Sequence, residues 1–188
     1  DSVDFFEQRD GLPLDITAVG EDPDGELWIG TRGDGALRLV RSGARTFDPE
    51  HGLANERIMS IFRLDSETVC ATNRKGLSCL RGDEIHHGSL WPPGSQPVGW
   101  GWNQIVARDR DGSLWFAMGE GLVHWPRMNA IEDFGRVQPG ARHLLNGDEA
   151  FRVWFDSSGR LWTSTFGPKP LSIVTVQSPV SGIVMLAR

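Results

Sequence analysis

The chain has 188 residues, of which 39 % are hydrophobic and 23 % charged, a composition typical of a globular domain with one sizeable core rather than of a disordered segment. Its net charge of −6 at pH 7 and its lack of a Lys/Arg cluster argue against a nucleic-acid partner. No apolar run approaches the ~18–20 residues that a bilayer span needs, so we expect no membrane contact by this segment.

Short apolar runs separated by turns predict an all-β fold, because the 23 Gly and 11 Pro fall between these runs. A first strand is predicted at 3–8, and it belongs to none of the four groups of strands that come after it. Four groups of four strands follow it, at 16–21, 26–32, 35–40 and 44–48; at 57–64, 68–73, 76–81 and 84–88; at 103–108, 113–118, 122–126 and within 131–137; and at 151–156, 160–166, 171–176 and 182–186.

One motif returns in each group. The stretch at 22–31, Asp-Pro-Asp-Gly-Glu-Leu-Trp-Ile-Gly-Thr, has altered copies at 64–72, 109–117 and 156–165. The alignment equates Trp28, Val69, Trp115 and Trp162, and the steps from 28 to 69, 69 to 115 and 115 to 162 lie in the ~40–50 residue range of four-stranded propeller blades. The polar turn suits a hairpin and the strand after it suits burial on both faces. We therefore interpret the repeated Trp as core between blades.

The repeat predicts a β-propeller segment of about four four-stranded antiparallel blades. They occupy about 9–50, 51–90, 99–138 and 147–188 of one domain, and 1–8 is left over. The extra strand favours a segment of a larger propeller, for example a seven-bladed one, although a closed four-bladed ring also agrees with the count. An open arc would expose two blade faces, so we expect self-association or packing against further blades of a parent protein.

Two cysteines flank the turn at 73–76. Cys70 and Cys79 then face each other across a strand pair, where a disulfide forms only in a non-hydrogen-bonded pair with suitable Cβ geometry. We favour the alternative of two buried thiols. A metal site is not expected, because four N/S ligands are not gathered in the sequence, and no cofactor is predicted.

The best-preserved copy of the repeat, with Asp10-Gly11-Leu12, Ile16-Thr17-Ala18-Val19, Gly25, Leu27-Trp28-Ile29-Gly30-Thr31 and Gly35, resembles the repeat of two-component regulator propellers. The likeness extends along nearly the whole chain and is weakest in the fourth copy. It implies the periplasmic or otherwise extracytoplasmic sensor part of a membrane-spanning histidine kinase or hybrid regulator. Such a part binds a ligand, a carbohydrate in some groups, and passes the signal inward.

The connections between blades must lie on one face of the disc, at 9–15, 51–56, 89–102 and 136–150. The last two are long, and departures from a repeat are where a site is expected. In the first of these long loops, Trp91, Trp100 and Trp102 could stack on the apolar faces of sugars. The alternative is that these rings pack down as a plug of the loop.

The second long loop carries Arg136, Arg142 and His143, which offer donors for a hydroxyl-rich or anionic ligand. The alternative is a solvated loop with incidental charges. These three residues and the three tryptophans are the predicted ligand-binding set.

Catalysis is not expected. The acidic turn also resembles the Asp-box of sialidases, but those enzymes use a Tyr nucleophile and this chain has no Tyr. The Gly-x-Ser-x-Gly elbow of hydrolases is missing from the sequence. For a propeller lyase, His143 and Glu149 are the one pair to test. The predicted function is a ligand-sensing propeller, and the alternative is a structural or protein-interaction propeller.

Overall fold

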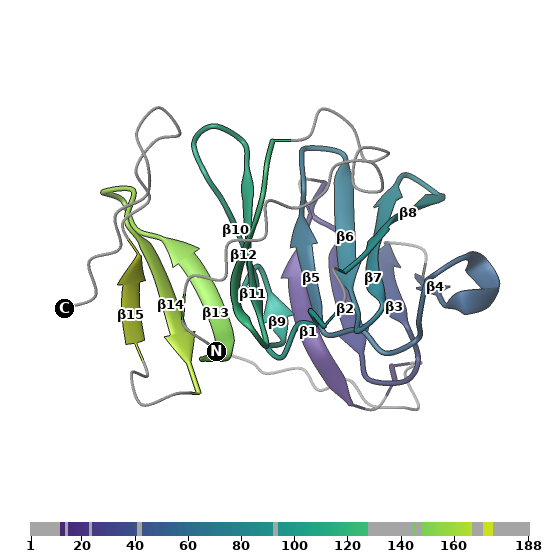
Figure 1. Cartoon of the computed structure of the whole chain (residues 1–188). Coiled ribbons are helices and arrows are strands. Elements are labelled where there is room, and N and C mark those ends of the chain that lie inside the picture. Colours follow the sequence, from purple (N-terminus) through teal and green to yellow (C-terminus); the bar gives the residue numbers. More distant parts are fainter. Residues whose placement is uncertain are drawn as a thin grey trace, which may run out of the picture.

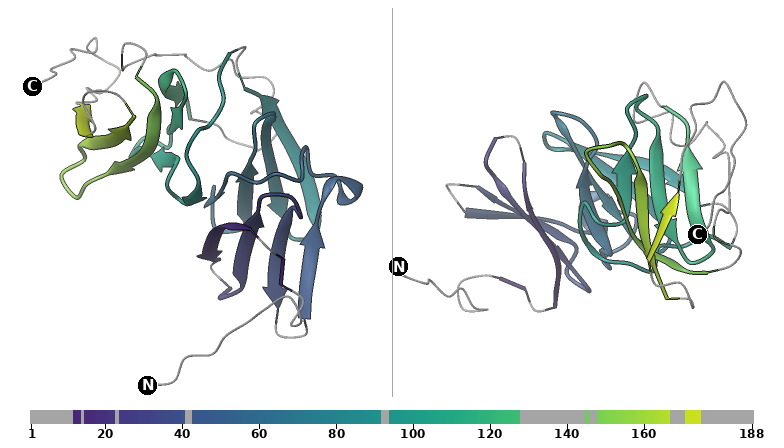
Figure 2. Two further views of the ribbon diagram at one scale, coloured as in Figure 1. Left: turned by 90° about the horizontal axis from the view of Figure 1, so that it is seen from below. Right: turned by 90° about the vertical axis from the view of Figure 1, so that its left-hand side faces the viewer.

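The computed structural model describes residues 12–13, 15–22, 24–40, 43–91, 94–127, 145, 148–166 and 171–174. Within them the chain is all-β, and its strands form four sheets that stand side by side (Figure 1). Seen from below, the sheets follow a curve with β1–β4 at one end and β13–β15 at the other (Figure 2). The predicted all-β propeller segment is confirmed. The strands predicted at 3–8, within 131–137 and at 182–186 lie outside the described residues.

We call the sheets blades 1 to 4. Blade 1 consists of β1 (Ile16–Glu21), β2 (Leu27–Thr31), β3 (Ala36–Val40) and β4 (Gly43–Phe47). Blade 2 consists of β5 (Ser60–Arg63), β6 (Thr68–Thr72), β7 (Gly76–Arg81) and β8 (Glu84–Leu90), with β9 (Gly101–Trp102) added in parallel to β5. Between them lies η2, a 3-10 turn at Pro49–His51.

Blade 3 consists of β10 (Val106–Arg108), β11 (Leu114–Met118) and β12 (Gly121–Trp125), and blade 4 of β13 (Ala150–Phe155), β14 (Leu161–Thr165) and β15 (Leu171–Val174). In every blade these strands pair in chain order with their antiparallel neighbours. Their ends fall within about three residues of the prediction. The parallel strand β9 was not predicted.

The first turn of every blade is closed by the same backbone hydrogen bond. It runs over four residues, at 2.9–3.0 Å, from the N–H of Asp22, Leu64, Asp109 and Asp156 to the carbonyl of Glu26, Thr68, Ser113 and Arg160. Counted from these turns, Cys70 stands where Trp28 stands, so the equation of Val69 with Trp28 is wrong by one residue. In the alignment of the sequence repeats, Asp65 is equivalent to Asp24. In the alignment based on the hydrogen bond of the turn, Ser66 is equivalent to Asp24 instead.

Trp28 and its equivalent in each of the other blades face a residue on the neighbouring strand, and the type of this cross-strand pair differs from blade to blade. The four pairs are Trp28 with Arg38, Cys70 with Cys79, Trp115 with His124 and Trp162 with Ile173. In blade 2 the pair is a disulfide between two fully buried residues with a Cα–Cα distance of 4.0 Å. The preference for two thiols was therefore wrong. Close Cα atoms of this kind are those of a non-hydrogen-bonded antiparallel pair.

Buried apolar side chains fill the spaces between blades. One cluster lies between blades 1 and 2 and includes Trp28 and Ile61, and a second joins blades 2, 3 and 4 around Phe116 and Trp115. The prediction that Trp28 and Trp115 form inter-blade core is confirmed. Trp162 is only half-buried, because it lies on the side of blade 4 that faces away from blade 3.

The acidic turn also fixes the tryptophan of its own blade. In blade 1, Asp22 Oδ2 accepts the indole N–H of Trp28 at 2.8 Å, and in blade 4, Asp156 Oδ2 accepts that of Trp162 at 2.8 Å. The other carboxylate oxygen of each Asp accepts two backbone N–H groups of the turn. These aspartates thus join the turn to the strand that follows it.

This arrangement makes stability depend on pH. The indole N–H of Trp162, followed by the backbone N–H of Arg160, holds the pKa of Asp156 well below its ordinary value. The Asp156 carboxylate therefore contributes its full share to the free energy of unfolding above its unfolded-state pKa of ~3.9. This share is lost as the pH falls toward the folded-state pKa. We expect Asp156→Asn to flatten the decline of the melting temperature between neutral and acidic pH, measured by circular dichroism.

The substitution Asp34→Asn, in the next turn of blade 1, controls for the removal of one carboxylate. If the melting temperatures of the wild type and of Asp156→Asn decline in parallel over the whole pH range, this role of Asp156 is contradicted.

Candidate functional site

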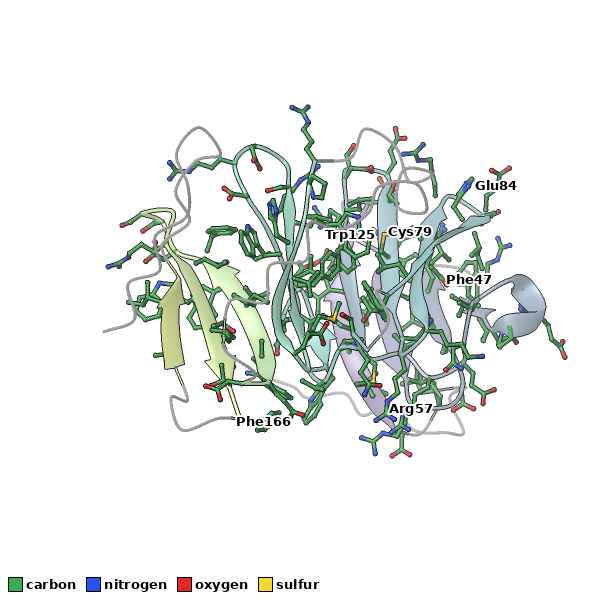
Figure 3. All side chains as sticks on the ribbon, viewed as in Figure 1. Phe47, Arg57, Cys79, Glu84, Trp125 and Phe166 are labelled. Atoms are coloured by element: carbon green, nitrogen blue, oxygen red, sulfur yellow. A yellow bond between two sulfur atoms is a disulfide. The ribbon has the colours of Figure 1, made fainter. Side chains whose placement is uncertain are left out.

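The first strands of the four blades all begin at one face of the arc. Because strands alternate in direction, the start of a blade's first strand and the end of its second strand lie at the same edge. Gly101 pairs with Ser60, the first residue of β5, so the loop at 94–103 reaches this edge too. Figure 3 shows Arg57, which precedes β5, and Phe166, which follows β14, at the same end of the molecule. We call this end the linker face.

Three aromatic side chains gather on the linker face. The ring of Phe151 meets the ring of Trp100 edge to face, with centroids 4.7 Å apart, and meets that of Phe166 in the same way at 4.9 Å. Trp100 and Phe166 are exposed, and Phe151 is half-buried between them. The guanidinium of Arg152 lies 5.3 Å from the centre of the Phe151 ring. We call Trp100, Phe151 and Phe166 the aromatic cluster.

A β-bulge directs Phe151 toward this cluster. The pairing of β13 with β14 shifts between Ala150 and Arg152, so Phe151 is the extra residue of the bulge. Bulges of this kind turn a side chain away from the regular alternation of a strand. Blade 1 has the same shift at Thr17, whose hydroxyl donates to the carbonyl of Ile58 at 2.9 Å. The repeated bulge thus carries an inter-blade tether in blade 1 and an aromatic ring in blade 4.

Backbone contacts on both sides hold Trp100 in place. A methyl group at Gly99 would overlap the carbonyl oxygen of Phe151, so only glycine allows the loop to approach blade 4 this closely. On the other side, the N–H of Gly101 donates to the carbonyl of Met59 at 3.1 Å, and Gly101 has a φ of 115°. The loop is therefore fixed between the innermost strands of blades 2 and 4.

The other two tryptophans predicted to bind a ligand, Trp91 and Trp102, pack against other parts of the protein. Trp91 is buried, donates its indole N–H to the carbonyl of Asn73 at 2.7 Å and packs edge to face on Phe116 and Trp125. Trp102 is half-buried and lies directly on Gly20 of blade 1, where a methyl group would overlap its ring. Trp91 therefore lies in the core, and of the three tryptophans predicted to bind a ligand only Trp100 belongs to the aromatic cluster.

The second predicted part of the site, Arg136, Arg142 and His143, lies outside the described residues. Glu149, the other member of the predicted lyase pair, is exposed, and its carbonyl accepts the N–H of Phe166 at 3.1 Å. Sequence reasoning missed Phe151 and Phe166. The sequence feature that could have pointed to these two residues is the fourth repeat, which departs most from the pattern of the others.

The chemistry of the cluster is that of a stacking surface. Aromatic rings with exposed edges and faces bind the apolar faces of other rings, and a neighbouring guanidinium adds charged donors. Within the described ranges, no group of three or more His, Cys, Asp or Glu residues could hold a metal ion. The described part of the chain also contains no helix long and apolar enough to cross a membrane.

Comparison with known families identifies the first repeat. Residues 10–33 match the family described as two component regulator propeller. This segment is similar to a two-component regulator propeller repeat. It covers the N-terminal part of the chain up to the turn after β2, the part in which the motif is best preserved. No curated protein matches the chain.

Several solved structures share the arrangement of the blades. The extracellular domain of BT4673 from B. thetaiotaomicron, described as a one component system, superimposes with a TM-score of 0.69 at 16 % identity, over 93 % of this chain and 23 % of that one. Virginiamycin B lyase from Staphylococcus aureus gives a TM-score of 0.61 at 17 % identity, over 86 % of this chain and 52 % of the lyase.

A third structure, described as an oxidoreductase (glucose dehydrogenase) from Thermus thermophilus, gives a TM-score of 0.52 at 16 % identity, over 87 % of this chain and 62 % of that one. The chain thus spans about half the length of the lyase and less than a quarter of the BT4673 domain. At these identities the similarity shows the fold alone, which is that of a β-propeller.

Proposed function

We propose that this chain is a non-catalytic, ligand-binding part of a sensor propeller, with a carbohydrate as the ligand. The aromatic cluster carries this proposal. Its exposed rings, Trp100 and Phe166, come from two separate segments of the linker face. Both pack on Phe151, which the bulge of β13 positions, and Gly99 holds the loop of Trp100 against blade 4. A preformed surface of this kind suits the flat apolar face of a sugar ring, and Arg152 suits a hydroxyl or carboxylate at its edge.

The same proposal places the chain outside the cytoplasm. A structural disulfide between Cys70 and Cys79 persists in oxidising compartments and is rare in the cytosol. The family match to the two component regulator propellers and the fold shared with an extracellular sensor domain of B. thetaiotaomicron support the same location. In this arrangement the propeller meets its ligand on the outer side of the membrane and passes the signal inward.

The fold alone does not decide between binding and catalysis, because a lyase and a described oxidoreductase share it. The composition of the cluster favours binding. Its three members supply ring carbons and an indole N–H, and none of them is a general acid, a general base or a nucleophile in the usual range of pH. The runner-up, a protein-interaction propeller, is favoured by the apolar faces at the two ends of the arc.

Calorimetric titration tests the proposal. Neutral and uronate-containing oligosaccharides are added to the wild type, to Trp100→Ala and to Trp154→Ala. Loss of one stacked ring is expected to weaken binding about tenfold, since an aromatic contact contributes ~0.5–1.5 kcal/mol beyond its buried area. We expect this loss in Trp100→Ala alone, with an unchanged melting temperature, because Trp100 is exposed.

Trp154→Ala is the matched control, because it removes an indole of similar exposure at another place. Equal weakening in both variants, or cleavage of the added oligosaccharide during the titration, would contradict a non-catalytic site at the aromatic cluster.

A further inference from the structure

The segment that carries Trp100 is joined to all four blades. We call residues 96–104 the inner loop. Its strand β9, which Figure 1 shows beside β1 and β5, pairs with β5 of blade 2. At one end of the loop the carbonyl of Gln96 accepts the N–H of Gly119 in blade 3 at 2.9 Å, and at the other end the carbonyl of Gln104 accepts the N–H of Val153 in blade 4 at 2.9 Å. Trp102 makes the contact with blade 1.

Trp102 fills a space that blade 1 itself leaves open. Counted from the hydrogen bonds of the turns, Gly20 corresponds to Phe62 of blade 2, which is buried and packs against the next blade. Gly20 pairs with Trp28, so a side chain at this position would point toward blade 2, as Trp28 does. The ring of Trp102 lies there instead, since a methyl group at Gly20 would overlap it, and it packs on the cluster between blades 1 and 2.

Gly101 links the position of Trp102 to that of Trp100. It is the single residue between the two tryptophans, and β5 and the residue before it hold its backbone. Its N–H donates to the carbonyl of Met59 at 3.1 Å, and its carbonyl accepts the hydroxyl of Ser60. One short, fixed stretch of backbone therefore carries a ring seated in blade 1 and a ring of the aromatic cluster beside blade 4.

We propose that Trp102, seated on Gly20, positions Trp100 and thereby couples the aromatic cluster to blade 1. This inference rests on the proposed function, and it assigns to Trp102 a positioning role in place of direct contact with the ligand. A stacking ring contributes most to affinity when it is held in place before the ligand arrives. Because coupling is reciprocal, a ligand that fixes Trp100 also favours Trp102 in its seat, so binding beside blade 4 acts on the junction of blades 1 and 2.

The substitution Gly20→Ala tests this inference, because it displaces Trp102 while every ring of the site stays present. The added methyl group would overlap the Trp102 ring, so we expect Trp102 to leave its seat and Trp100 to lose its fixed position. Binding of the oligosaccharides used for calorimetry should weaken by up to about tenfold, as expected for Trp100→Ala. The matched control is Gly33→Ala, also in blade 1. Apart from the chain neighbours of Gly33, no atom of the described residues lies within 4 Å of the added methyl group, so this variant should bind as the wild type does.

Nitrogen-15 signals of the indole N–H groups separate positioning from a general loss of stability. In ligand-free Gly20→Ala we expect the signal of Trp100 to shift, because the ring of Phe151 lies 4.7 Å from that of Trp100 in the wild type, centroid to centroid. The signal of the buried Trp115 should stay in place. Trp102→Phe, which keeps a ring on Gly20, should resemble the wild type in affinity and in the Trp100 signal.

The inference is overturned if Gly20→Ala binds as tightly as the wild type and keeps its Trp100 signal while Trp100→Ala binds weakly. The proposed binding site then stands, and only the coupling is wrong. It is also overturned if the indole N–H of Trp102 in the wild type exchanges with solvent equally fast with and without saturating oligosaccharide, since reciprocity predicts slower exchange with ligand. If Trp100→Ala itself binds as tightly as the wild type, the proposed function fails and the coupling fails with it.

Discussion

Replacing Phe116 with alanine is expected to destabilise the chain by about 3–5 kcal/mol, the usual cost of removing a buried aromatic side chain. Phe116 is fully buried where blades 2 and 3 meet. Its ring lies 5.4 Å from that of Trp91 and 5.7 Å from that of Trp125, centroid to centroid. Alanine would leave these rings facing a cavity. Because domains have only ~5–15 kcal/mol of stability, the loss should be evident as a lower urea midpoint.

The matched control is Phe166→Ala, which removes the same side chain from an exposed position. It should change the unfolding free energy by less than about 0.5 kcal/mol, as most surface substitutions do. If Phe116→Ala unfolds at the same urea concentration as Phe166→Ala, the contact between blades 2 and 3 does not form a stabilising core.

Removing the disulfide is expected to lower the unfolding free energy by about 2–3 kcal/mol, the loop-closure value for a short loop. Cys70 and Cys79 are nine positions apart in the sequence. Each kcal/mol shifts the melting temperature of a domain of this size by ~2–4 °C. Calorimetry of the wild type with and without reductant, and of the double variant Cys70→Ala/Cys79→Ala, measures the effect.

Reductant should have no effect on the double variant, which separates loss of the disulfide from any other action of the reagent. A wild type that melts at the same temperature with and without reductant would instead support the two free thiols that the sequence alone favoured. In that case the cysteines would no longer support an extracytoplasmic location.

The repeat made most of the fold predictable. Each blade starts with a polar turn and continues into a strand buried on both faces, and this pattern is visible in a single sequence at Trp28, Trp115 and Trp162. It failed by one residue in blade 2, where the marker is Cys70 instead of Trp. A disulfide to Cys79 takes the place of the ring there, and no rule of spacing distinguishes that pair from two thiols.

The site was less predictable, because it depends on contacts between distant parts of the chain. Trp91 and Trp100 lie in one Pro- and Gly-rich loop and look alike in the sequence. The carbonyl of Asn73 and the rings of blade 3 draw Trp91 into the core, whereas Gly99 and β9 hold Trp100 at the surface. Neither the parallel pairing of β9 with β5 nor the bulge at Phe151 leaves a sign in local patterning.

We propose that the aromatic cluster on the linker face binds the ligand. Nitrogen-15 spectra of the indole N–H groups test it most directly, because each of the eight tryptophans gives its own signal. On addition of the oligosaccharides used for calorimetry, we expect the signal of Trp100 to shift while those of the buried Trp91 and Trp115 stay in place. An unchanged Trp100 signal together with shifts of Trp154 and Trp162 would place the ligand on the exposed side of blade 4 and contradict a ligand site at the aromatic cluster.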